Sequence, residues 1–102
     1  MKREEILNNA KICTTQDRNN QYGEPEDVFS FVAAKWQVHM DNRPPGPLTA
    51  HDVAMMMIDL KTARSTSNPA HIDNYVDIAG YAACGGEIVS KKRTESLDLV
   101  MR

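Results

Sequence analysis

Residues 42–64 decide the fold of this 102-residue chain and read NRPPGPLTAHDVAMMMIDLKTAR. The prolines at the start remove backbone donors and restrict the residues before them, so this part is a stiff connector and not a helix. Thr49 then has the character of an N-cap, and Asp52 follows at the spacing of a capping box. We therefore predict a helix from about Ala50 to Arg64. Apolar side chains nearly encircle it from Val53 to Leu60, so we expect it to be the most buried helix.

Three further helices are predicted around this one, over about residues 3–18, 25–40 and 71–89. Each has apolar residues at helical spacing, and turn residues separate each from the next. Strand signals are weak, because no segment alternates between apolar and polar residues. We predict an all-α fold, a four-helix bundle-like single domain with short loops over residues 1–90. The tail, residues 91–102, is expected either to fray or to dock on a partner subunit.

Composition limits the classes of function. The chain is 41% hydrophobic and 25% charged, which fits a soluble globular protein, and its net charge of −2 argues against a nucleic acid or a membrane surface as the partner. No apolar run is long enough to span a bilayer, and the N-terminus lacks the apolar core of a signal peptide. Cys13 and Cys84 stand far apart, and the histidines are not at zinc-ligand spacing with them. We expect a cytoplasmic protein, in the host cytoplasm if it is viral.

The predicted helix over residues 50–64 also bears on assembly. A helix that is apolar nearly all round needs a large core, and a small four-helix chain has little core in which to bury it. We therefore expect a homodimer or a larger homo-oligomer.

Two carboxylates in the last predicted helix are candidate metal ligands. Asp73 and Asp77 are four residues apart, which makes them neighbours on a helix, and together they could share a divalent cation. Gly80 continues the same stripe and leaves room for a ligand or another backbone. The alternative is that Asp73 complements the helix dipole and Asp77 is solvated. Asp52 is a third candidate ligand, reaching the pair across a helix interface, or else it is only a cap.

Two cations are candidate phosphate ligands. Arg64 falls at the middle of the apolar face of the helix over residues 50–64, and Lys61 lies at its edge. A cation in line with a core stripe is expensive to bury unless an anion meets it, and Asp73, Asp77 or a bound phosphate could be that anion. The alternative is that both side chains reach solvent at the helix C-terminus.

Two aromatic residues are candidates for stacking on a nucleobase, Tyr22 and Trp36. Trp36 also lies at helical spacing with apolar neighbours, and this position favours a place in the core.

Several blocks of the chain together resemble a family of short phage and prophage proteins of unassigned function. The resemblance covers nearly the whole chain, up to about Ile88. The blocks are Asp17-Arg18, Tyr22-Gly23-x-Pro25-Glu26-Asp27, Phe29, Trp36, Asp52-Val53, Lys61-x-x-Arg64 and Asp73-Asn74-x-x-Asp77-x-x-Gly80-Tyr81.

More distantly, the layout is similar to that of the MazG-like all-α nucleoside triphosphate pyrophosphatases, which bind Mg²⁺ and hydrolyse nucleotides to monophosphate and pyrophosphate. This resemblance implies a metal-binding and catalytic role for Asp73 and Asp77, and phosphate contacts from Lys61 and Arg64. The Glu-Glu-x-x-Glu motif of those enzymes has no counterpart here. Two readings follow: a Mg²⁺-dependent pyrophosphohydrolase, or a degenerate relative that still binds nucleotides. The alternative is a noncatalytic helical protein that binds a host or viral protein.

Overall fold

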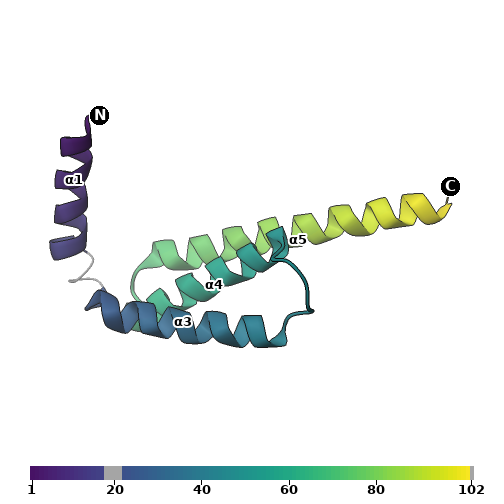
Figure 1. The fold of residues 1–102 in the computed structure, drawn as a ribbon, viewed down its shortest axis with the longest axis horizontal. Coiled ribbons are helices and arrows are strands. Elements are labelled where there is room, and N and C mark those ends of the chain that lie inside the picture. Colours follow the sequence, from purple (N-terminus) through teal and green to yellow (C-terminus); the bar gives the residue numbers. More distant parts are fainter. Residues whose placement is uncertain (18–21, 102) are drawn as a thin grey trace.

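The computed structural model describes residues 1–17 and 22–101 of the chain. Four α-helices and one short π-helical turn account for most of these residues, and no strand occurs among them (Figure 1). The predicted all-α class with four helices is confirmed. In chain order the elements are α1 (Arg3–Ile12), the π-helical turn η1 (Cys13–Asp17), α3 (Pro25–Asn42), α4 (Ala50–Ser67) and α5 (Ile72–Met101). None of the described helices is long and apolar enough to cross a membrane.

Three of the helices form the body of the molecule. The contact between α4 and α5 is the most extensive, and α3 lies against α4. Within the described residues α1 contacts only η1, and it extends away from the other three helices (Figure 1). The four helices therefore do not share one core: α4 lies between α3 and α5, and α1 stands apart.

Small side chains allow α4 and α5 to approach closely. Ala54 and Ala63 of α4 are buried, and so is Gly85 of α5. A β-carbon placed on Gly85 would lie 3.2 Å from the Ala54 Cβ, which is tighter than ordinary van der Waals contact. The expectation that the helix beginning at Ala50 is the most buried is met, because α4 contains three of the buried residues, Asp52 among them.

A hydrogen bond and one apolar side chain hold α3 against α4. The indole Nε1 of Trp36 donates to the backbone carbonyl of Met56 at 2.7 Å. Val32, one turn earlier on α3, is buried. Trp36 therefore has the structural role that its helical spacing favours.

The predicted capping box at the start of α4 is present. The Thr49 hydroxyl accepts from the Asp52 backbone N–H at 3.2 Å, and the Thr49 N–H donates to Asp52 Oδ2 at 2.8 Å. These two hydrogen bonds satisfy backbone donors that have no partner within the helix.

The same carboxylate also holds the proline-rich connector. Arg43 donates from Nε to Asp52 Oδ1 at 3.0 Å, and the Nε2 of His39 lies 2.9 Å from the same oxygen. The remaining guanidinium nitrogens of Arg43 donate to the carbonyls of Gly46 and Pro47, each at 2.8 Å. Gly46 has a φ of +130°, a backbone conformation that other residues rarely adopt. The connector is thus closed around Asp52, which is only 4% exposed.

The last helix is longer than the sequence pattern predicts. We expected it to end near Val89, but α5 continues to Met101 and projects beyond the body of the molecule (Figure 1). Residues 87–101 contain neither glycine nor proline, so nothing stops the helix. Lys91 pairs with Glu87 at 3.4 Å across one turn, which is a favourable spacing.

Replacing the central carboxylate of the connector should destabilise the protein. The Arg43 guanidinium and the Thr49 backbone N–H hold the pKa of Asp52 well below its ordinary value. We expect Asp52→Asn to melt at a clearly lower temperature than the unmodified protein, because the variant leaves Arg43 without its partner. Asp59→Asn on the same helix is the matched control and should melt almost unchanged.

The pH dependence provides a second check. A lowered pKa in the folded state stabilises the protein above the pKa of the unfolded chain, near 4, and this contribution is lost as the pH falls further. The difference in free energy of unfolding between the unmodified protein and Asp52→Asn should therefore shrink below about pH 4. A difference that stays constant from pH 7 to pH 2.5 would contradict this assignment.

Candidate functional site

A polar pocket of about 300 Å³ lies where the end of α4 meets the start of α5. Five of the residues singled out from the sequence line it: Tyr22, Lys61, Arg64, Asp73 and Asp77. The remaining lining residues are Cys13, Asp17, His71 and Asn74. The antiparallel arrangement of α4 and α5 accounts for this convergence, since it brings the last two turns of one helix beside the first two turns of the next (Figure 1).

An ion pair connects the two helices across this pocket. The Nζ of Lys61 on α4 lies 2.9 Å from the Oδ2 of Asp77 on α5. The lysine side chain is mostly buried, whereas the aspartate remains partly exposed. The other carboxylate oxygen of Asp77 makes no hydrogen bond or ion pair within the described part of the chain. Asp77 is therefore held in place by Lys61 while it can still accept a ligand.

Arg64 meets an aromatic ring and not a carboxylate. Its guanidinium carbon lies 5.5 Å from the centre of the Tyr22 ring, a cation–π contact. Among residues 1–17 and 22–101, no carboxylate forms an ion pair with Arg64. Of the possible anions, neither Asp73 nor Asp77 pairs with Arg64 in this structure, and Asp77 is paired with Lys61 instead. A bound anion remains the open alternative.

Asn74 is a polar residue of this pocket that sequence reasoning did not single out. It is 2% exposed, and its Nδ2 donates to the Tyr22 hydroxyl at 3.4 Å. The Tyr22 ring in turn meets the His71 ring edge-on, with the centroids 6.1 Å apart. The amide oxygen of Asn74 makes no hydrogen bond among the described residues. Buried polar atoms are normally paired, so this oxygen at a pocket wall is available to a ligand.

Asp73 is the most exposed of the candidate ligands. The Nε2 of His71 lies 4.0 Å from its carboxylate. Within the described residues, no three His, Cys, Asp or Glu side chains are close enough together to hold a metal ion. A cation in this pocket would therefore take at most two of its three carboxylates, which are Asp17, Asp73 and Asp77, and its remaining ligands from other oxygens. Mg²⁺ commonly binds in this manner beside substrate phosphates.

Two sequence-predicted residues lie outside the pocket. Asp52 lies at the opposite end of α4 from Arg64, and even Lys61 is about 14 Å away from it along the helix axis. Its carboxylate already accepts hydrogen bonds from Arg43 and Thr49. The indole N–H of Trp36 already donates to the Met56 carbonyl. Helical periodicity shows which residues share a face but not which end of the neighbouring helix they meet. The structure therefore does not bring Asp52 to the Asp73–Asp77 pair, and of the two aromatic candidates only Tyr22 lines the pocket.

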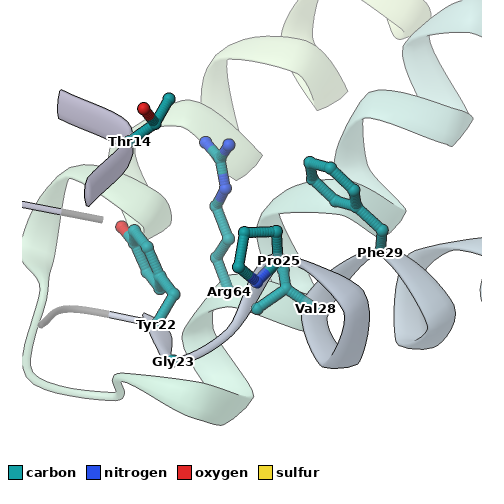
Figure 2. A pocket seen from close by; sticks show the side chains of 7 residues that line it. All are labelled: Thr14, Tyr22, Gly23, Pro25, Val28, Phe29 and Arg64. Carbon is teal, nitrogen blue, oxygen red and sulfur yellow. The ribbon is translucent and has the colours of Figure 1, made fainter. Parts of the chain in front are cut away.

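A smaller apolar pocket of about 110 Å³ adjoins the polar one. Tyr22 and Arg64 line both pockets and so form their common border. Figure 2 shows the Arg64 side chain extended between the Tyr22 ring and the Phe29 ring, with its guanidinium beyond them. The other lining residues are Thr14 from η1 and Gly23, Pro25 and Val28 around the start of α3.

The fold and these two pockets define a small all-α protein with a site that is charged at one end and apolar at the other. The chain belongs to the family described as domain of unknown function DUF6378, whose model matches residues 5–89. This family has no assigned function, and the two relatives described next are phage proteins, so the resemblance to phage proteins of unassigned function is confirmed.

Two phage proteins are among its relatives. The chain is 33% identical over 81 residues to the Gene 55 protein of Mycobacterium phage D29, an alignment that covers 79% of this chain and 51% of that protein. It is 38% identical over 77 residues to the Gene 55 protein of Mycobacterium phage L5, covering 76% of this chain and 47% of that protein. The chain thus spans about half the length of the curated relatives it matches. No solved structure matches it.

The contacts of Arg64 predict a small effect on stability. We expect Arg64→Ala to lower the free energy of unfolding by no more than about 1 kcal/mol, because a partly exposed cation–π contact contributes on that order. Arg43→Ala is the matched control and should destabilise the protein far more, since it leaves the buried Asp52 carboxylate without its main partner. Chemical denaturation of the three proteins makes the comparison. Equal losses from both substitutions would mean that Arg64 is a structural residue and not a ligand-binding one.

Proposed function

We propose that the polar pocket binds the phosphate groups of a nucleoside triphosphate together with Mg²⁺. The observation that supports this most strongly is the convergence of Lys61, Arg64, Asp73 and Asp77 on one pocket beside Tyr22. Titratable groups that converge on one pocket from two different helices are candidates for a binding site.

Each charged residue has a distinct role in this proposal. Arg64, which has no carboxylate partner among the described residues, offers its guanidinium to a phosphate, a group that it can contact through two parallel hydrogen bonds. Lys61, one turn before Arg64 on α4, offers a point charge while it holds Asp77 in place.

The donor set also fits a hard cation. Oxygen ligands of the kind that Mg²⁺ prefers are the carboxylates of Asp73 and Asp77 and the amide oxygen of Asn74, which makes no hydrogen bond among the described residues. Bound there, Mg²⁺ would neutralise charge on the phosphate chain. Tyr22 borders the pocket and would contact the rest of the nucleotide.

The resemblance to the MazG-like pyrophosphatases is suggested by the sequence alone, and neither the family nor the phage relatives establish it. With that resemblance, the proposal extends to a reaction, hydrolysis of the triphosphate to a monophosphate and pyrophosphate. Because the Glu-Glu-x-x-Glu motif of those enzymes has no counterpart, the proposal includes a degenerate form that binds nucleotides without hydrolysing them. Pyrophosphate release in the presence of Mg²⁺ distinguishes these two forms.

A second candidate is a noncatalytic protein that binds a host or viral protein through its helices. The large apolar side chains that remain exposed favour this candidate, among them Phe31, Val38 and Met40 on α3. It requires no occupant for the polar pocket, so nucleotide binding decides between the two candidates.

Removing one carboxylate charge should weaken nucleotide binding. Asp77→Asn keeps the size of the side chain but removes the charge that a hard cation needs, so we expect Mg²⁺-dependent binding to weaken at least about tenfold, which is 1.4 kcal/mol. Isothermal titration calorimetry with ATP, with and without Mg²⁺, measures this. Asp59→Asn, on α4 but outside the pocket, is the matched control and should bind as the unmodified protein does. Identical isotherms for all three proteins would contradict the proposed role of Asp77.

The two cysteines provide an independent readout of the same pocket. Both cysteines are exposed, but Cys13 lines the polar pocket, whereas Cys84 on α5 lines neither pocket. Bound nucleotide should slow alkylation of Cys13 and leave Cys84 unchanged, which peptide mass spectrometry resolves. Equal alkylation rates with and without nucleotide would count against binding at this site.

A further inference from the structure

We infer that the apolar pocket beside Arg64 receives the base of the nucleotide whose phosphates occupy the polar pocket, with Phe29 as its main contact. This inference rests on the proposed function and adds to it the place of the base and a residue that discriminates nucleotides from simple polyphosphates. Neither Phe29 nor this pocket was singled out from the sequence as a base contact.

The shared border of the two pockets limits which ligand can fill both. Tyr22 and Arg64 belong to both linings, so a ligand that enters both passes directly along these side chains. Such a ligand must be anionic at the end beside Lys61 and flat and apolar at the end beside Phe29. A nucleotide has this division, with its phosphates and its base joined through a sugar.

Phe29 has the exposure expected of a binding residue and not of a core residue. Its side chain is 65% exposed, although phenylalanine is usually buried. Its ring stands at one side of the apolar pocket, across from Tyr22 (Figure 2). Pro25 and Val28, both near the start of α3, provide the apolar wall between them. An exposed aromatic ring beside an apolar hollow is a suitable surface for stacking a planar base.

The test compares two ligands that share phosphates but not a base. ATP and inorganic tripolyphosphate, each with Mg²⁺, are titrated into the unmodified protein, Phe29→Ala and Val38→Ala. We expect Phe29→Ala to weaken ATP binding about tenfold, in the range that loss of base–aromatic stacking produces, and to leave tripolyphosphate binding unchanged. Val38, an equally exposed apolar residue farther along α3, should affect neither ligand.

The outcomes separate this inference from the proposed function. If Phe29→Ala binds ATP as tightly as the unmodified protein, or if it loses both ligands equally, the base does not lie against Phe29. If the unmodified protein binds ATP no better than tripolyphosphate, the phosphate site stands and the base site is overturned. If it binds neither ligand, the proposed function fails together with this inference. Because Phe29 is exposed, we expect Phe29→Ala to fold as the unmodified protein does. Circular dichroism of each variant checks that it is folded.

The large exposed area of the chain supports a second inference, which concerns the outer surface of α5. The chain exposes 7821 Å², whereas a compact monomer of 11.4 kDa exposes about 5,800 Å². Its radius of gyration is 17.8 Å, compared with about 13 Å for a compact domain of this length. Among the described residues only three apolar side chains are buried: Val32, Ala54 and Ala63. So small a core leaves the chain short of the apolar burial that stabilises a domain.

We propose that a second copy of the chain covers the outer face of α5. Ile72 and Val76 are 67% and 62% exposed there, and Ala79 and Ala83 continue the same stripe, also exposed. The excess surface of about 2,000 Å² per chain lies within the range that one subunit of an obligate dimer buries. Gly80 borders the stripe, and a side chain at that position would meet nothing within 4 Å, so another helix can approach closely. Because the net charge is only −2, two copies of the chain repel each other little when they associate.

Sedimentation decides this second inference. We expect the unmodified protein to sediment as a dimer at about 10 μM, a concentration well above the dissociation constant of a stable obligate dimer. Val76→Glu should shift it to monomer or to unfolded chain, while Val38→Glu on α3 leaves the dimer intact. A folded monomer of the unmodified protein at high micromolar concentration overturns the inference. The same holds if the monomer instead binds a different protein through this face. A dimer that is unaffected by Val76→Glu shows that α5 is not the interface.

Discussion

The contact of α4 with α5 at Ala54 and Gly85 is the constraint on which the rest of the molecule depends. Because neither residue has a side chain beyond a methyl group, the two helix backbones approach closely and their relative register is set there. From this point the helices run side by side to their connection, and Lys61 meets Asp77 two turns farther along. A bulky residue at position 85 would separate the helices and with them the charged groups of the polar pocket.

Local patterns in the sequence predict much of this fold. The prolines after Asn42 and the capping box at Thr49 define the start of α4 because both act over a few residues. The contacts of the Asp52 carboxylate with Arg43 and His39 were not predicted, since they depend on how a connector closes in three dimensions. The end of α5 is not predicted either, because the basic run after Val89 resembles the start of a tail although nothing in it breaks a helix.

The candidate site was predicted in part, for a related reason. Periodicity places Asp73 and Asp77 on one face of a helix and Lys61 near Arg64 on another, and a short connection makes it natural for these faces to meet. It does not specify which cation pairs with which carboxylate. Asn74 was missed because burial of a polar residue next to a candidate ligand leaves no signal in a single sequence. The roles of these residues in binding remain predictions.

The order of contacts along the chain has a consequence for how the protein folds. Within the described residues, α4 packs against the helix before it and the helix after it, so the extensive contacts between helices join elements that follow one another in the chain. Loops that close over short separations lose little entropy, and proteins built from such local contacts reach the native state within microseconds to milliseconds. The helical body of this chain can therefore assemble progressively, with each helix finding its neighbour soon after both have been synthesised.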